Sequence, residues 1–147
     1  MPRPSTTALL AAAALALPAA GRAEAPMTTP FDGSYDDAVF AVENAIIGRG
    51  LVIDWVSHVG EMLARTGGDV SAEAEVIFDD AQVFLFCSAS VSREVMEADH
   101  MLISHCPYGI FVFEKDGEVV IGHDDYPDGP MQAVEDLLAG IVADATE

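Results

Sequence analysis

The sequence predicts an α+β domain with two layers, in which helices lie mainly on one face of an antiparallel or mixed sheet of about four strands. Segments with apolar residues at helical spacing alternate along the chain with β-branched and aromatic runs. The pair Asp116-Gly117 separates two apolar runs and is typical of a hairpin turn. Because such helices need an apolar sheet to cover, a sheet covered on one face is the simplest arrangement.

The first residues have the pattern of an export signal. Arg3 precedes an uncharged apolar run over 8–17 that is too short to span a bilayer, and Ala23-Glu24-Ala25 is typical of a cleavage site. The alternative is an alanine-rich N-terminal helix of a cytosolic protein. We therefore expect a signal peptide over 1–25, a periplasmic or secreted location, and a mature protein that is not embedded in the membrane.

The rest of the chain predicts a single domain over 34–147, preceded by a short turn-rich leader over 26–33. Ser34 and Asp37 predict a capping box at the start of the first helix, and Gly48 favours its end. The elements expected after it are a strand over 51–57, a helical turn over 61–65, a loop over 66–69, a strand over 82–86, a helix over 91–103, strands over 110–114 and 118–123, and a helix over 131–142.

Two of these segments have ambiguous patterns. The strand over 82–86 does not alternate apolar with polar residues, so we expect it to be buried on both faces. The spacing over 72–78 is compatible with a helix.

The chain is strongly acidic, with 25 Asp and Glu against 6 Lys and Arg and a net charge of −19. Such a field repels phosphate backbones and anionic lipid surfaces, so nucleic-acid binding and membrane-surface roles are disfavoured. It favours cations or basic partners, although solubility alone also explains it. The sequence contains no GxSxG, P-loop, GxGxxG, CxxC, CxxCH or HExxH motif. We therefore expect a protein that is not an enzyme.

Cys87 and Cys106 admit three interpretations. A structural disulfide is favoured in an exported protein and would stabilise the fold by about 3 kcal/mol. A redox-active pair is the second, because Cys87 stands before a predicted helix whose N-terminus would stabilise a thiolate. A copper or zinc site is the third. If the strand that ends at Cys87 ran parallel to the strand after Cys106, these ends would lie at opposite edges and disfavour the disulfide.

The candidates for binding a ligand or metal, besides the cysteines, are His105, His58, His100, Asp124 and Asp125. His105 is the strongest because it adjoins a cysteine, although a single histidine can equally be a packed or surface residue. The two aspartates belong to an acidic loop that lacks the ligand spacing of an EF-hand, so a solvated turn is the alternative.

Several short motifs follow one another in a distinctive order: Met62-Leu63-Ala64-Arg65-Thr66 with Asp69-Val70, Phe86-Cys87-Ser88-Ala89, Ser92-Arg93, Met96-Glu97-Ala98-Asp99 and Cys106-Pro107-Tyr108. This series resembles the domain of unknown function 302 family and is most similar to its exported bacterial members. The resemblance implies a compact α/β fold that can form a homodimer, and it implies no established activity. Two positions differ from the expected pattern: His100 replaces a proline, and His123-Asp124-Asp125 replaces a more aromatic and basic strand end.

The sequence thus predicts a periplasmic, non-enzymatic module that binds a small ligand, a metal or a partner protein. The alternative is a thiol-based redox or sulfur-handling protein that uses Cys87 and Cys106. A metal chaperone that combines these cysteines with His105 is a third hypothesis.

Overall fold

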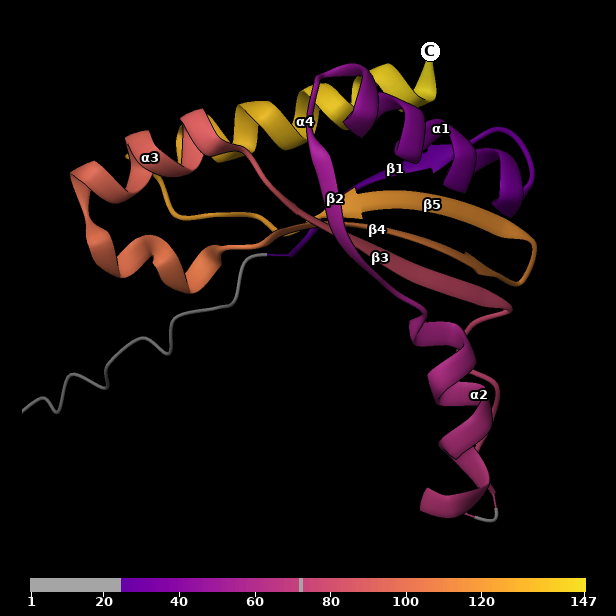
Figure 1. Ribbon diagram of the computed structural model, residues 1–147. Helices are drawn as coiled ribbons and strands as arrows, with labels where there is room; N and C mark the ends of the chain where they lie inside the picture. The colour runs from indigo at the N-terminus through magenta and orange to yellow at the C-terminus, as the bar shows by residue number, and fades with distance from the viewer. Residues whose placement is uncertain (1–24, 72) are drawn as a thin grey trace, which may run out of the picture.

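The computed structural model describes residues 25–71 and 73–147, and five strands in this part of the chain form one antiparallel sheet (Figure 1). The order of the strands in the sheet is β1-β5-β4-β3-β2. The strands are β1 (Met27–Phe31), β2 (Val52–Ser57), β3 (Asp80–Cys87), β4 (Tyr108–Lys115) and β5 (Glu118–His123). The helices are α1 (Tyr35–Gly48), α2 (Val59–Val70), α3 (Ala89–Ala98), the 3-10 helix η1 (His100–His105) and α4 (Gln132–Thr146).

The predicted α+β class is confirmed, with one more strand than expected. The predicted signal peptide lies outside the described residues except for Ala25. The segment expected to be a leader contains β1, which pairs with β5 from Met27 opposite His123 onward. Pro30 cannot donate a hydrogen bond, and an edge strand is the place in a sheet where proline is tolerated.

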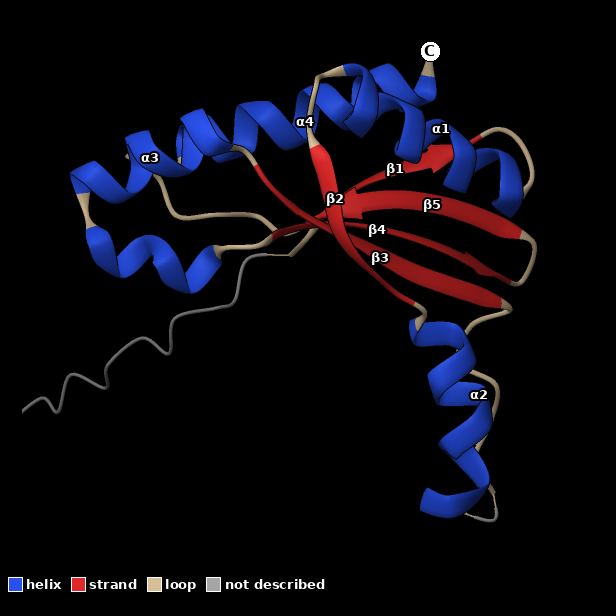
Figure 2. Ribbon diagram, in the orientation of Figure 1, coloured by secondary structure: helices blue, strands red, loops and turns tan. Residues whose placement is uncertain are grey.

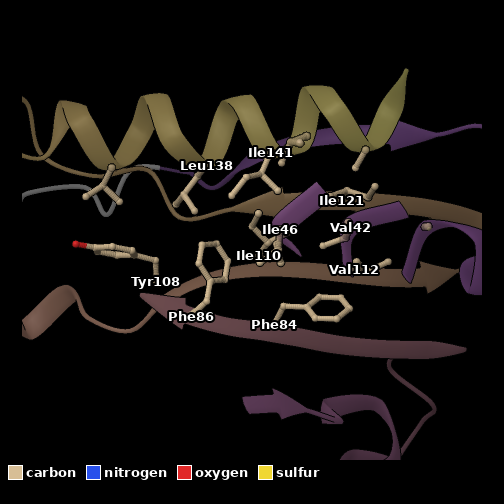
Figure 3. Close-up of a cluster of buried hydrophobic side chains, with 14 of the residues drawn as sticks. Val42, Ile46, Phe84, Phe86, Tyr108, Ile110, Val112, Ile121, Leu138 and Ile141 are labelled. Carbon is tan, nitrogen blue, oxygen red and sulfur yellow. The ribbon is translucent and has the colours of Figure 1, made fainter. Parts of the chain in front are cut away.

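Helices α1 and α4 lie next to each other over one face of the sheet, and the hydrophobic core fills the space between the two layers (Figure 2). The capping box at α1 is confirmed, because the Asp37 N–H donates to Ser34 Oγ at 3.1 Å while the Asp37 carboxylate accepts from the Ser34 N–H at 3.3 Å. The large buried side chains of the core include Val42, Ile46, Phe84, Phe86, Tyr108, Ile110, Val112, Ile121, Leu138 and Ile141 (Figure 3).

Several predicted helix boundaries were wrong. Helix α2 continues through the segment 66–69 that was expected to be a loop, and Thr66 Oγ1 donates to the Met62 carbonyl at 2.8 Å within it. The segment 73–78 is not helical. The helix expected over 91–103 is two helices, because Asp99 has extended backbone and accepts from the Met101 N–H at 2.9 Å, which starts η1.

The β4–β5 hairpin turns at Asp116-Gly117 as predicted, with positive φ angles of 54° and 80° that suit this pair. The Asp116 N–H donates to Asp79 Oδ2 at 2.8 Å, which fixes the turn to the start of β3. The prediction that β3 is buried on both faces was wrong. Phe84 and Phe86 are buried beneath the helices, whereas the alternate residues Val83 and Leu85 remain partly exposed on the other face, called the open face here.

Helix α2 projects away from the sheet, which it contacts near its N-terminal end at Gly60, and the segment 73–78 returns to β3 beside it (Figure 1). None of its residues is buried, and Met62 and Val70 are exposed apolar side chains. In the described part of the chain, no helix combines the length and apolar character that crossing a membrane requires.

Candidate functional site

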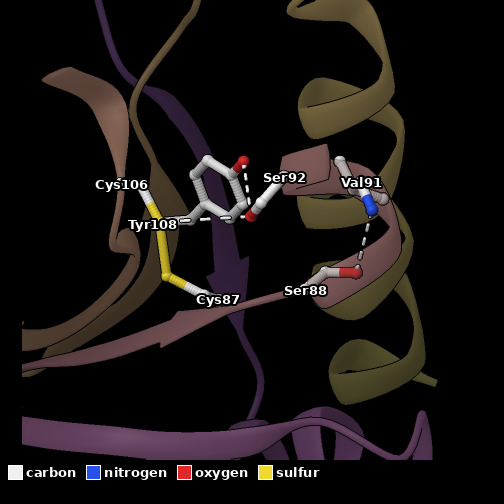
Figure 4. The surroundings of a disulfide bond; sticks show 6 residues. All are labelled: Cys87, Ser88, Val91, Ser92, Cys106 and Tyr108. Atoms are coloured by element: carbon white, nitrogen blue, oxygen red, sulfur yellow. Dashed lines mark hydrogen bonds between the residues drawn. A yellow bond between two sulfur atoms is a disulfide. The ribbon is translucent and has the colours of Figure 1, made fainter. Parts of the chain in front are cut away.

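The cysteines are brought together by the antiparallel pairing of β3 and β4. Phe86 lies opposite Tyr108, so the end of β3 meets the start of β4. Cys87 and Cys106 form a disulfide there, with their Cα atoms 6.6 Å apart (Figure 4). The parallel arrangement that would have disfavoured this bond is not the one observed.

A cleft of about 530 Å³ lies beside the disulfide, at the end of the open face. Its floor consists of strand residues that point away from the core: Val83, Leu85, Gly109 and Phe111. Its wall comes from the end of η1, the start of β4 and the loop after β5: Ser104, His105, Cys106, Pro107, Asp124 and Tyr126. The antiparallel register therefore brings segments from three parts of the chain to one cavity.

Small residues make room for the aromatic floor. A Cβ on Gly109 would lie 3.3 Å from Val83 Cγ1, and a Cβ on Gly122 would collide with the Phe111 ring. The Phe111 ring also stacks on Phe113, with centroids 6.1 Å apart. A second hollow of about 210 Å³ shares Val83 and Phe111 with the cleft, so the apolar surface continues along the open face.

Trp55 extends this surface on the neighbouring strand. It lies opposite Leu85 in the register of β2 and β3, and 67% of it is exposed. It is the only tryptophan of the chain. Its fluorescence can therefore report the binding of a molecule beside it in the cleft.

Tyr126 is the main aromatic residue of the wall. Its backbone N–H donates to Glu135 Oε1 at 2.6 Å, and its ring makes edge contacts with His105 at 5.5 Å and Tyr108 at 6.4 Å between centroids. Burial, together with the charge of Asp124, raises the pKa of Tyr126 to about 12. The phenol is therefore neutral at physiological pH. Among the described residues that line the cleft none is lysine or arginine, so Asp124 gives the wall a negative charge.

The disulfide lies beside the start of α3 (Figure 4), and its residue Cys106 belongs to the lining of the cleft. Cys87 directly precedes the N-cap residue Ser88, whose side chain accepts from the Val91 N–H at 3.4 Å. Ser92, in the same helix, has its Oγ 4.0 Å from Cys106 Sγ and 3.1 Å from the Tyr108 hydroxyl. Helix α3 therefore lies beside both cysteines.

The structure brings together three of the residues singled out in the sequence, namely His105, Cys106 and Asp124, in the lining of the cleft. It does not add the others: His58 is an exposed residue before α2, His100 is exposed at the start of η1, and Asp125 is not part of the lining. The described residues contain no group of three or more His, Cys, Asp or Glu side chains that could hold a metal ion.

Sequence reasoning missed Tyr126 and the apolar floor. The signal for the floor was present in the failure of β3 to alternate, which was interpreted as burial on both faces. His123 was noted only as part of a strand end that departs from the family pattern. It is 3% exposed, with Nδ1 2.8 Å from the Asp124 carbonyl oxygen and 4.0 Å from Glu135 Oε2. This histidine fixes the loop that carries the wall.

Comparison with known proteins agrees with the fold. The family model described as domain of unknown function DUF302 matches residues 27–147. The crystal structure of an uncharacterized conserved protein DUF302 from Bacillus stearothermophilus has a TM-score of 0.67 to this chain at 14% sequence identity, covering 83% of this chain and 98% of that one. At this identity the likeness shows the fold alone. No curated protein matches the chain significantly.

Proposed function

Because the chain belongs to the family described as domain of unknown function DUF302, which has no assigned activity, we propose a function from the geometry of its own cleft. The cleft binds a small molecule that has a flat apolar body and a positive charge, and the protein acts as a binding module without catalysis. The observation that carries this proposal is the apolar floor of the cleft next to the carboxylate of Asp124.

The floor provides the affinity. Val83, Leu85 and Phe111 are partly exposed, so a ligand that covers them removes apolar surface from water, at about 25 cal/mol per Å². The volume of about 530 Å³ lies in the range of small-molecule sites. Flat rings suit this floor best, because the Phe111 and Tyr126 rings offer aromatic contacts.

The wall provides the selectivity. Asp124 attracts a cation, and the buried, neutral Tyr126 adds no charge to this wall. The net charge of −19 strengthens this preference at long range and repels anions. The export signal pattern over 1–25 supports a periplasmic site of action.

Three probes that share a benzene ring test the proposal by quenching of Trp55 fluorescence and by NMR shift mapping. These are phenyltrimethylammonium, neutral benzyl alcohol and anionic benzoate. We expect binding in that order, with shifts at Leu85 and Phe111. Benzoate binding as tightly as the cation, or shifts confined to another surface, would contradict the proposal.

The charge is tested by Asp124→Asn, with Asp128→Asn as the matched control. Asp128 is an exposed residue of the same loop that does not line the cleft. We expect Asp124→Asn to weaken binding of the cation by about threefold, since a solvent-exposed charge contributes little. Binding of benzyl alcohol to this variant, and of either probe to the control, should not change.

Thiol–disulfide exchange is the second candidate function, because Cys106 of the disulfide lines the cleft. A small thiol that enters the cleft can therefore approach this sulfur. Thiol titration after exposure of the folded protein to millimolar glutathione or dithiothreitol tests it. A bond that stays intact in both reagents would identify the disulfide as structural.

Copper or zinc binding remains a prediction that elemental analysis of the purified protein can test. Cysteine binds these metals as a thiolate, so the disulfide would first have to be reduced. A homodimer also remains a proposal. The exposed apolar residues Met62, Val70 and Val76 at α2 and the segment after it are where a second copy could pack, and analytical ultracentrifugation measures this.

A further inference from the structure

Both cysteines of the disulfide are partly exposed, but they differ in their position relative to the cleft. Cys106 belongs to the lining of the cleft, whereas Cys87 does not and leads directly into α3. A thiol that approaches through the cleft therefore meets Cys106 before Cys87. This difference bears on which cysteine the thiol attacks and which cysteine leaves as a thiolate.

We infer that exchange follows one direction, with Cys106 Sγ as the atom attacked and Cys87 as the leaving thiolate. This inference rests on the second candidate function, thiol–disulfide exchange at the cleft. The reaction partner is a small dithiol without negative charge, because Asp124 and the overall acidity of the chain repel anionic thiols.

The start of α3 favours the departure of Cys87. The N–H groups of the first turn of a helix lack acceptors within the helix and carry partial positive charge. Helix α3 is 10 residues long and has no acidic residue in its first turn, so no carboxylate opposes a thiolate that forms there. Cys87 directly precedes the N-cap Ser88 and therefore lies at this positive end.

Ser92 can assist the second half of the reaction. Its hydroxyl lies 4.0 Å from Cys106 Sγ and 3.1 Å from the Tyr108 hydroxyl. When Cys106 is released as a thiolate, the Ser92 O–H can turn to donate to it. Each sulfur therefore has a neighbouring group that stabilises its anionic form.

The steps balance as follows. One thiolate of the dithiol forms a bond to Cys106 Sγ, and the Cys87–Cys106 bond breaks with its electron pair on Cys87. The second thiolate of the dithiol then attacks the first sulfur of the dithiol, which is bonded to Cys106 Sγ. A disulfide forms within the dithiol, and Cys106 leaves as a thiolate. The dithiol is oxidised to a disulfide, the protein bond is reduced by two electrons, and the two cysteines take up the two protons that the dithiol released.

Wild-type protein tests the direction without any variant that might fail to fold. The folded protein is treated with 2-mercaptoethanol, quenched in acid with N-ethylmaleimide, and mapped by mass spectrometry. We expect mercaptoethanol on the Cys106 peptide and maleimide on the Cys87 peptide. The reverse pattern, or an equal mixture, would overturn the inference and leave exchange itself standing, whereas a bond that resists dithiothreitol would remove both.

Substitutions at Ser90 test the role of α3. Ser90 is exposed in the first turn of the helix, and its Oγ lies 3.3 Å from Oγ of the N-cap residue Ser88. Aspartate and asparagine at this position both lose that contact, so the two variants differ in charge alone. We expect Ser90→Asp to slow reduction by dithiothreitol by about threefold, because its carboxylate repels the forming Cys87 thiolate. Ser90→Asn has the same shape without the charge and should leave the rate unchanged. Equal rates for the two variants would overturn this part of the inference.

Discussion

The two faces of the sheet are built from alternate residues of the same strands, yet one face is buried and the other remains partly exposed. Phe84, Phe86 and Ile110 are buried beneath α1 and α4. Their neighbours Val83, Leu85 and Phe111 are equally apolar but remain partly exposed on the open face. The difference therefore lies in the helices that cover one face and not in the hydrophobicity of the residues. An apolar sheet surface that the fold leaves partly open is available to a ligand, and the cleft lies on it.

Truncating one residue of each face should give the largest contrast. We expect Phe86→Ala to lower the free energy of unfolding by about 3–5 kcal/mol, because it leaves a cavity in the core. Leu85→Ala should cost only about 1 kcal/mol, since its side chain already contacts water. Urea unfolding measures both. If the two substitutions lowered the free energy of unfolding equally, and if this loss depended on protein concentration, a second copy of the chain would have to cover the open face.

The disulfide joins the two strands at the cleft, and removing it should have the next largest effect. We expect Cys87→Ala combined with Cys106→Ala to lower the free energy of unfolding by about 3 kcal/mol, because the unfolded chain regains the freedom of the open loop. Reduced wild-type protein is the matched control and should unfold at the same urea concentration as the double variant. A midpoint that is unaffected by reduction would show that β3 and β4 hold this end without the bond.

The sequence predicted the covered face well and the open face poorly, for a physical reason. The buried residues Ala38, Val42 and Ile46 of α1 repeat with the period of the helix, so the spacing of apolar residues in the sequence indicates which side of a helix faces the core. The runs over 82–86 and 110–113 show which residues are apolar, but they do not show whether a helix covers them. The coverage of these runs depends on how the helices are placed in space, and α2 projects away from the sheet (Figure 1).

The candidate site was predicted only in part for a similar reason. His105 and Cys106 are neighbours in sequence, so the cysteine identified the histidine beside it as a candidate. Asp124 and Tyr126 reach the cleft because β5 pairs with β4 and ends beside it, with Ile110 opposite His123. The Asp116-Gly117 hairpin predicted the pairing of β5 with β4, but local patterns could not place β3 beside β4, so they could not show that the loop after β5 adjoins an apolar floor.

A methyl group at Gly122 should disturb the open face selectively. A Cβ there would collide with the Phe111 ring on this face and with the Met27 carbonyl of β1. We expect Gly122→Ala to cost about 1–3 kcal/mol, as overpacking usually does, and to weaken probe binding by displacing Phe111. Gly48→Ala is the control, because a Cβ at Gly48 meets no other atom within 4 Å. Unchanged binding in Gly122→Ala would show that Phe111 is not part of the binding floor.

The smallest expected effect concerns Tyr35 of α1 and Tyr126 of the cleft. Burial first, and then the charge of Asp80 for Tyr35 and of Asp124 for Tyr126, raises both pKa values from 10.0 to about 12. Between these pH values the unfolded chain has lost phenol protons that the folded chain retains, so stability falls as pH rises from 10 to 12. Tyr126→Phe should make this fall less steep in urea unfolding.

A bound cation should separate the two tyrosines. Phenyltrimethylammonium beside Tyr126 favours its ionised form, so the pKa of Tyr126 should fall when the cleft is occupied. The pKa of Tyr35, which lies on α1 and not in the cleft lining, should stay the same. Tyrosinate absorbance after rapid pH jumps reports both groups, and Tyr126→Phe and Tyr35→Phe assign the steps. If the cation shifted both titrations equally, its effect would be one of ionic strength. This result would contradict specific binding of the cation in the cleft.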